Sequence, residues 1–379
     1  REAYERVFQR ITTMIRDDIA LSLLHLPPAT LVHLWDYYAS AAEVLSASRD
    51  DLTERAGLTA RTAEKIVSCS TYEAADRQLE FAKRWGIRVI PFSSDDYPAL
   101  LRSAPDAPSL VYVKGDFDFT AHGDRYVGIV GTRRMTAAGE AVTRKVVDEL
   151  AAISDKTVII SGLAYGIDGV AHRAALDNGL RTVAVVAHGL DTIYPAQHRD
   201  LARRIIEAHG AIVTEYPSGT SPLPPNFLAR NRIVAGMSEA LFVAETPAKG
   251  GSLVTADIAD SYHREVFAAP GRATDRSFEG CISLIRSDKA NICVCGEDIA
   301  TVMGWHNYRT TNARELPFLS LTPQEQALYD AFDNGEEIYK ESLVERSGLS
   351  VAEASKALTM MQLHGVIKAV KGMMYIKLK

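Results

Sequence analysis

The sequence has little cysteine and no long apolar run. Four cysteines in 379 residues are too few for a disulfide scaffold of this length, which fits a reducing compartment. No apolar run approaches the roughly 20 residues that span a bilayer, and the first ten residues lack the basic-then-apolar order of a signal peptide. We therefore expect a cytoplasmic protein without a membrane partner. Its first residue is not methionine, which is compatible with a removed leader or tag.

The sequence also lacks an excess of positive charge. Lys and Arg number 42 against 48 Asp and Glu, which gives a formal net charge of -6 and a pI near 6.0. Any polyanion must therefore bind at a local basic patch. The hydrophobic share of 47% and the charged share of 24% are typical of a globular protein, and the length predicts two or three domains.

Cys293 and Cys295 raise the question of a metal site. No second Cys or His pair at zinc spacing completes a set of four ligands. A short buried strand over Asn291-Cys295, with both cysteines as small apolar residues, is the interpretation that we favour. We expect no metal and no cofactor.

Three regions differ in their apolar pattern. Residues 1–84 carry apolar residues at helical spacing from Ile19 to about Phe81, which predicts a helical domain. A second region covers residues 85–306, and it begins with a predicted strand over Trp85-Pro91. Tyr97 to Asp118 is interpreted as a proline-punctuated connector.

Short β-rich runs alternate with helical stretches from Arg125 to about Val302. Parallel neighbours need crossover connections, so this alternation predicts an α/β fold with a doubly wound, mainly parallel sheet. The predicted helices include Gly139-Ile153 and Gly166-Asn178. The predicted strands are Tyr126-Val130, Thr157-Ser161, Thr182-Ala187, Ala211-Thr214, Ala240-Ala244, Glu265-Ala268 and Asn291-Cys295.

The last region, residues 319–379, follows a predicted linker over residues 307–318. Thr322 is predicted to cap a helix, with Pro323 at its first position and Glu325 three residues after the cap. Two further helices and a hairpin around Lys371-Gly372 complete the pattern of a winged helix.

Three loops at the carboxyl ends of predicted strands combine small residues with hydrogen-bond donors. Glycines let backbone N–H groups approach a phosphate, helix N-termini favour anions, and guanidinium groups bind phosphate oxygens in pairs. A nearby helical segment adds two arginines, which could reach phosphates or pair with carboxylates of the core. The loops are Gly131-Thr132-Arg133-Arg134, Ser161-Gly162 with Tyr165-Gly166, and Lys249-Gly250-Gly251-Ser252, and the segment is Phe227 with Arg230-Asn231-Arg232.

Cations interleaved with aromatic side chains suit a single-stranded nucleic acid, whose phosphates need charge and whose bases need a stacking surface. The aromatic residues of these loops are Tyr165, Tyr194, Tyr216 and Phe227. We therefore predict that the loops and the segment together bind single-stranded DNA in one crevice.

Asp168 and His172 are spaced i, i+4 on one predicted helix and could form an acid–base pair. The alternative, which we favour, is a carboxylate that interacts with the helix dipole beside a surface histidine. No nucleophile or metal cluster accompanies the two residues, so we predict no catalytic residue.

Seven motifs of the central region, taken together and in this order, resemble the DprA/Smf family, the DNA-processing proteins A of bacterial natural transformation. They are Gly128-Ile-Val-Gly-Thr-Arg133, Ser161-Gly-Leu-Ala-Tyr-Gly-Ile-Asp168 with His172, Gly189-Leu-Asp-Thr-Ile-Tyr-Pro195, Glu215-Tyr-Pro-Ser-Gly219, Phe227 to Gly236, Lys249-Gly-Gly-Ser-Leu-Val-Thr-Ala256, and Val266-Phe-Ala-Ala-Pro-Gly271 with Gly280-Cys281.

The resemblance implies a Rossmann-like core that binds single-stranded DNA, forms a homodimer and loads the RecA recombinase, without an established catalytic activity. By motif position, Arg133 and Lys249 resemble the phosphate-contacting residues of the family. The terminal regions resemble its accessory domains, a helical domain of the SAM or helix-hairpin-helix kind and a winged helix. The sequence departs from the family at Ala187-His188, Ile282 and Lys289.

Two other functions stay open. A nucleotide-processing enzyme of related fold would carry a Pro-Gly-Gly-x-Gly-Thr segment followed by Glu, whereas here Lys249-Gly250-Gly251-Ser252 leads into Leu253. A duplex-reading regulator would show a basic winged helix. Residues 319–379 hold 7 Lys and Arg against 8 Asp and Glu, a net charge of -1, so docking of a partner or docking onto the chain itself is the better hypothesis for this region.

Overall fold

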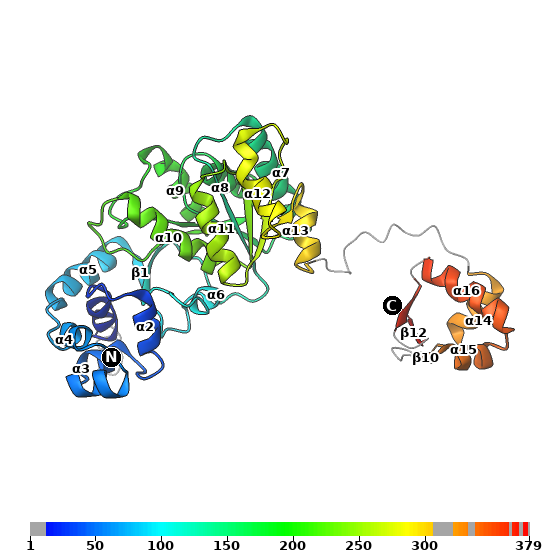
Figure 1. Ribbon diagram of the computed structural model, residues 1–379, viewed down its shortest axis with the longest axis horizontal. Helices are drawn as coiled ribbons and strands as arrows, with labels where there is room; N and C mark the ends of the chain where they lie inside the picture. The colour runs from blue at the N-terminus through cyan, green and yellow to red at the C-terminus, as the bar shows by residue number, and fades with distance from the viewer. Residues whose placement is uncertain (1–12, 306–320, 333–337, 364–365, 371–373, 378–379) are drawn as a thin grey trace. The chain divides into compact units, whose positions relative to one another are not determined.

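The computed structural model describes residues 13–305, 321–332, 338–363, 366–370 and 374–377. The chain divides into two compact units, Arg1–His306 and Asn307–Lys379 (Figure 1). The predicted linker 307–318 lies outside the described residues. No helix in the described part of the chain is long and apolar enough to cross a membrane.

The first unit is built on a nine-stranded sheet in the order β1-β2-β6-β5-β4-β3-β7-β8-β9. The seven strands from β6 to β9 in this order are parallel, and β2 pairs antiparallel with both β1 and β6. The strands are β1 Ile87–Pro91, β2 Leu110–Lys114, β3 Arg125–Gly131, β4 Thr157–Ser161, β5 Arg181–Val185, β6 Ala211–Thr214, β7 Ala240–Glu245, β8 Glu265–Ala268 and β9 Asn291–Ile292.

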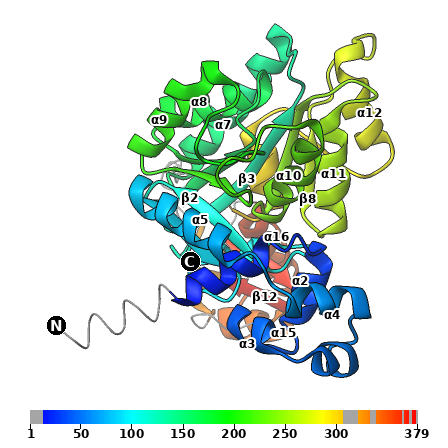
Figure 2. The same ribbon diagram turned by 90° about the vertical axis from the view of Figure 1, so that its left-hand side faces the viewer.

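Helices cover both faces of this sheet, which confirms the predicted doubly wound, mainly parallel α/β core. Figure 2 shows α7, α8 and α9 on one side of β3 and α10 and α11 on the other. The strands between them are buried on both faces, as crossover connections require. The helices are α7 Ala137–Ile153, α8 Ile167–Asp177, α9 Arg199–Glu207, α10 Pro224–Gly236, α11 Gly251–Ser261, α12 Glu279–Arg286 and α13 Gly296–Val302.

The prediction of a connector from Tyr97 to Asp118 was wrong. This stretch contains a short helix, α6 Ala99–Arg102, and the strand β2. The first four residues of β2 are buried and show no polar alternation, because β2 lies inside the sheet between β1 and β6. Pro105 and Pro108 precede the strand and take no part in its ladder.

Helices precede the sheet, as predicted. Residues 13–22 are helical, and the next helices bury a cluster of leucines and small residues. Ser40 and Thr59 cap two of these helices through their side-chain oxygens. Gly86, in the left-handed conformation at φ 58°, ends the last helix and leads into β1. The elements are α2 Pro28–Leu34, α3 Ala41–Ser46, the π-helix η1 Asp51–Arg55, α4 Ala60–Val67 and α5 Tyr72–Trp85.

In its described residues, the second unit shows three helices and a three-stranded antiparallel sheet in the order β10-β12-β11. Its first helix starts as predicted. The Thr322 hydroxyl accepts from the backbone N–H of Glu325 at 3.3 Å, and the Glu325 carboxylate accepts from the backbone N–H of Thr322 at 2.8 Å. The elements are α14 Pro323–Asp330, β10 Ile338–Tyr339, α15 Lys340–Ser347, α16 Val351–Leu363, β11 Ile367–Val370 and β12 Met374–Lys377. The predicted hairpin turn Lys371-Gly372 lies outside the described residues.

Candidate functional site

A cavity of about 300 Å³ lies at the carboxyl edge of the parallel strands. Loops after β3, β4 and β7 meet α10 there, at the position where the strand order reverses beside β3. Open α/β sheets bind their ligands at this place. The predicted site residues that line the cavity, called the pocket below, are Gly131, Thr132, Arg133, Phe227, Arg230, Asn231, Gly250, Gly251 and Ser252.

Two of the loops approach each other closely because Gly166 has no side chain. Gly166 adopts φ 75°, and a Cβ there would overlap the carbonyl oxygen of Thr132. The backbone N–H of Ile167 donates to that same carbonyl at 3.2 Å. Gly166 therefore joins the loop after β4 to the loop after β3 and does not itself line the pocket.

Opposite charges share the inner wall of the pocket. Arg230 is 4% exposed, and its Nη1 donates to the carbonyl oxygens of Gly162, at 2.6 Å, and of Val185. A side chain on Gly162 would overlap the Arg230 guanidinium. Asp168 is buried and accepts from the backbone N–H of Ala164 at 3.3 Å. Burial raises the pKa of Asp168, and the charge of Arg230 opposes that rise.

A cation and two aromatic rings form a stack at the mouth of the pocket. The Arg133 guanidinium carbon lies 4.8 Å from the centre of the Phe227 ring. The Phe227 ring lies 5.6 Å from that of Tyr194, at an angle of 59°. Arg133 and Tyr194 are exposed and Phe227 is half-buried, so the stack presents a positive charge and an exposed Tyr194 ring to a ligand.

The N-terminus of α11 faces the pocket without a side-chain cap. Gly250 is the N-cap residue, and Gly251 begins the helix. Ser252 is 7% exposed, and its hydroxyl has no hydrogen-bond partner among the described residues. Backbone N–H groups and a buried hydroxyl therefore meet at the positive end of a helix dipole. Lys249 is exposed and precedes Gly250 in the loop, outside the lining residues.

The structure does not bring Arg232 into the pocket. Its Nη2 forms a partly buried ion pair with Glu215, and its Nη1 donates to the carbonyl oxygen of Asp106 at 2.7 Å. Burial is the largest effect on Glu215 and raises the pKa of its carboxyl, while Arg232 opposes the rise. Arg232 thus pairs with the core, the second of its two predicted roles.

The remaining predicted residues surround the pocket without lining it. The Ser161 hydroxyl donates to the carbonyl oxygen of Ile129 at 2.6 Å and is fully buried. Tyr165 is 40% exposed and donates a hydrogen bond to Gln197. Arg134 is exposed, and its backbone N–H donates to the Thr132 hydroxyl at 3.1 Å.

Asp168 and His172 do not form the acid–base pair that the spacing allowed, and His172 is not at the surface. The His172 ring is fully buried, and its Nδ1 lies 2.7 Å from the Thr182 hydroxyl. That hydroxyl donates to the carbonyl oxygen of Ile159, so it accepts from Nδ1–H of His172. Burial lowers the pKa of His172 to about 3, which leaves the ring neutral.

Thr255 and His188 also belong to the site, although no role there was predicted for them. Thr255 lines the pocket one turn after Ser252. The i, i+3 spacing on a helix that begins at Gly251 was the available signal. His188 is buried, and its Nε2 accepts from the backbone N–H of Tyr194 at 3.1 Å, which fixes the loop that carries the ring stack. No pattern in the sequence reveals that contact.

The cysteines carry no metal site in the described part of the chain. All four are free, and no group of three or more His, Cys, Asp or Glu side chains there could hold an ion. The predicted buried strand over Asn291-Cys295 was too long. β9 ends at Ile292, and both of its residues are exposed, whereas the next residue, Cys293, is buried.

Residues 88–304 match the family model of DNA recombination-mediator protein A, and this range holds every residue of the pocket. The chain belongs to this family. The predicted resemblance to the DprA/Smf family is thereby confirmed.

Named relatives and solved structures agree with that membership. Protein Smf of Synechocystis is 37% identical over 262 residues, which cover 69% of this chain and 65% of the relative. The X-ray structure of DNA processing protein A from Streptococcus pneumoniae covers 74% of this chain and 95% of its own, at 30% identity and a TM-score of 0.62. DNA processing protein A of Helicobacter pylori, whose structure describes a single-stranded DNA binding mode, covers 58% of this chain and 96% of its own, at 27% identity and a TM-score of 0.50.

Proposed function

We propose that the pocket binds single-stranded DNA. Two features that lie together at the pocket carry the proposal. One is the stack of Arg133, Phe227 and Tyr194, and the other is the uncapped N-terminus of α11, where the Ser252 hydroxyl has no hydrogen-bond partner among the described residues. A phosphate supplies the acceptors that α11 lacks, and an unstacked base supplies the ring face. The binding mode described for the Helicobacter pylori relative supports the same ligand.

The charges of the chain agree with a local site. Arg133 is exposed at the pocket and Lys249 is exposed on the loop beside it, whereas the whole chain carries a net charge of -6. The strand is therefore held where these two cations lie, because the chain as a whole carries no excess of positive charge. In this proposal Arg133 and Lys249 contact phosphates, and Phe227 with Tyr194 contacts bases.

We infer a wider role that membership of the family supports: a cytoplasmic recombination mediator that forms a homodimer and passes its strand to the RecA recombinase without catalysis. We also propose that the second unit, whose described elements run helix, strand, helix, helix, strand, strand, is a winged helix that docks a partner, and that the helices before β1 form an accessory domain.

The test is binding of a labelled dT oligonucleotide to Arg133→Ala, Lys249→Ala and the double variant. We expect each single variant to lower the affinity and the double variant to abolish most of it. The log-log salt slope should become less negative by about 0.7 for each lost phosphate contact. Arg286→Ala, at an exposed residue of α12, is the matched control. Full affinity in the folded double variant would refute this site.

A nucleotide-processing enzyme is the alternative. Among the described residues that line the pocket, Asp168 is the single carboxylate, and it accepts from the backbone N–H of Ala164 and faces Arg230. That environment holds the carboxylate in place, and it provides no partner group that could act with Asp168 in general acid–base catalysis. Release of free base from common nucleotides by the wild-type protein, and its loss in Asp168→Asn, would favour this alternative.

A further inference from the structure

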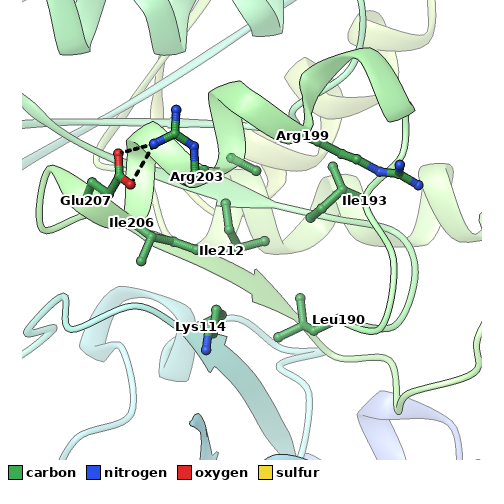
Figure 3. A pocket seen from close by; sticks show the side chains of 9 residues that line it. Lys114, Leu190, Ile193, Arg199, Arg203, Ile206, Glu207 and Ile212 are labelled. Atoms are coloured by element: carbon green, nitrogen blue, oxygen red, sulfur yellow. Dashed lines mark hydrogen bonds and ion pairs between the residues drawn. The ribbon is translucent and has the colours of Figure 1, made fainter. Parts of the chain in front are cut away.

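A second groove, of about 390 Å³, lies beside α9 and shares no lining residue with the pocket. Its floor is aliphatic. Ile212 of β6 lies at the centre, with Leu190, Ile193 and Ile206 around it (Figure 3). Lys114 of β2 lies directly opposite Ile212 in the antiparallel register. The groove therefore follows the seam between β6 and β2.

The topology of the sheet explains why this seam is open. Parallel neighbours are joined by crossover helices that cover the sheet face, and α9 links β5 to β6 and packs on both. β2 joins β6 as an antiparallel neighbour from an earlier part of the chain, so no crossover helix connects the two strands. The place next to α9, where a further crossover helix would lie, is the groove.

The charges around the groove are mainly positive. Arg203 donates two hydrogen bonds to Glu207, at 2.8 and 2.9 Å, and one to Asp200 at 2.6 Å, so its charge is neutralised within α9. Arg199 stands at the other end of the groove (Figure 3). It is exposed and has no ion-pair partner in the part of the chain that the structure describes. Lys114 adds a further positive charge.

We propose that this groove is a docking surface for an acidic amphipathic helix of a partner protein. Such a helix would lie beside α9 and cover the floor with its apolar stripe, and its flanking carboxylates would face Arg199 and Lys114. Nucleic acid fits less well, because the lining residues include no aromatic ring for a base to stack on. A second copy of the chain would bring one positive rim against another.

The test uses the full chain and a fluorescein-labelled designed peptide of 18 residues, with leucines on one helical face and glutamates on its flanks. A scrambled peptide of the same composition is the control. We expect saturable binding of the ordered peptide and weak binding of the scrambled one. Arg199→Glu should weaken the binding about fivefold or more, since an attractive charge becomes repulsive, whereas Arg286→Glu, an exposed arginine on α12, should leave it unchanged.

A second variant places a charged side chain on the aliphatic floor of the groove. Ile206→Glu should weaken peptide binding at least about tenfold, the equivalent of one buried aliphatic side chain. Its thermal unfolding shows whether it is folded. If Ile206→Glu does not fold, Arg199→Glu still tests the proposal. No saturable binding to the wild type, or unchanged binding in Arg199→Glu, overturns the proposal. Displacement of the peptide by a dT oligonucleotide overturns it in favour of nucleic acid, and a groove variant that alters the sedimentation of the peptide-free protein overturns it in favour of a second copy.

Discussion

Ser252 illustrates how one buried atom can oppose stability and serve binding. Its hydroxyl is buried in the pocket and has no hydrogen-bond partner among the described residues. A buried polar group without a partner costs about 1–3 kcal/mol. A phosphate oxygen at the N-terminus of α11 would accept a hydrogen bond from the hydroxyl and remove that cost. The gain in free energy would then add to the affinity for the ligand.

Ser252→Ala should therefore separate stability from binding. We expect the free energy of unfolding to stay constant or to rise, and the affinity for single-stranded DNA to fall about two- to tenfold, the worth of one hydrogen bond. Urea unfolding and oligonucleotide titration measure the two quantities.

Ser238→Ala is the matched control for this prediction. The buried Ser238 hydroxyl donates to the carbonyl oxygen of Val234 at 2.7 Å, so its removal should lower the free energy of unfolding by about 1–3 kcal/mol. It should leave the affinity of the folded protein unchanged, because Ser238 does not line the pocket. If Ser252→Ala behaves like Ser238→Ala in both measurements, the Ser252 hydroxyl is structural.

Arg230 and Arg232 show what residue types alone cannot decide. Both were predicted to lie in one crevice, yet residues two apart on a helix point in nearly opposite directions. Arg230 reaches the ends of β4 and β5, and Arg232 reaches Glu215 on another side of α10. The helix itself was predicted, but its rotation against the sheet depends on packing that the spacing of these two residues does not contain.

At the scale of elements, α5 holds the loop between β6 and α10 through a set of contacts that we call the Gln78 clasp. The Gln78 side-chain oxygen accepts from the backbone N–H and from the hydroxyl of Ser218, both at 2.8 Å, and its amide donates to the Ser218 carbonyl at 3.2 Å. The next N–H, of Gly219, donates to Asp191 at 2.7 Å. The loop of Asp191 carries Tyr194, so the clasp supports the ring stack at the pocket.

Gln78→Ala should weaken base contacts and spare phosphate contacts. We expect about two- to fivefold lower affinity for a dT oligonucleotide, equivalent to losing one or two neutral hydrogen bonds in the support of Tyr194. An abasic strand of the same length should bind Gln78→Ala and the wild type equally, because the clasp does not touch Arg133 or Lys249. Glu80→Ala, at an exposed residue of α5, is the control. Equal losses on both strands would contradict the positioning role.

The strand β2 could not be predicted from the pattern of its own residues. Leu110-Val-Tyr-Val-Lys114 is short, follows two prolines and lacks alternation, so it was interpreted as part of a connector. Its strand state depends on β1 and on β6, which is about 100 residues later in the chain. Six of the seven parallel strands were predictable because each is an apolar run between helical segments, whereas β9 is limited to the exposed residues Asn291–Ile292. β2 has no such flanks.

For the whole molecule, the buried histidine behind the pocket makes stability depend on pH. His172 has its pKa lowered from 6.5 to about 3 by burial, so the folded chain keeps this ring neutral. The unfolded chain protonates it below about pH 6.5, and in that interval it binds more protons than the folded chain. The free energy of unfolding must then fall as the pH falls from about 6.5 toward 3.

His172→Gln should reduce that dependence. Glutamine keeps a donor for the Thr182 hydroxyl and has no titration. Between pH 7 and pH 4.5 we expect the wild type to lose about 2–3 kcal/mol more unfolding free energy than the variant. Urea unfolding of both proteins at both pH values measures the two losses. Other titrating groups contribute equally to both proteins, so their effects cancel in the difference. Equal losses in the two proteins would show that His172 does not titrate in this way.

The strand order has a consequence for how the protein reaches its active form. From β3 the chain continues to β4, β5 and β6 on one side, and β7 leads to β8 and β9 on the other. Thr132 belongs to the first half and Ser252 to the second, and both line the pocket. The pocket is therefore complete only when the two halves are packed together. A ligand that touches both residues favours only chains in which the two halves have docked, so DNA would act on this protein as a selective folding partner as well as a cargo.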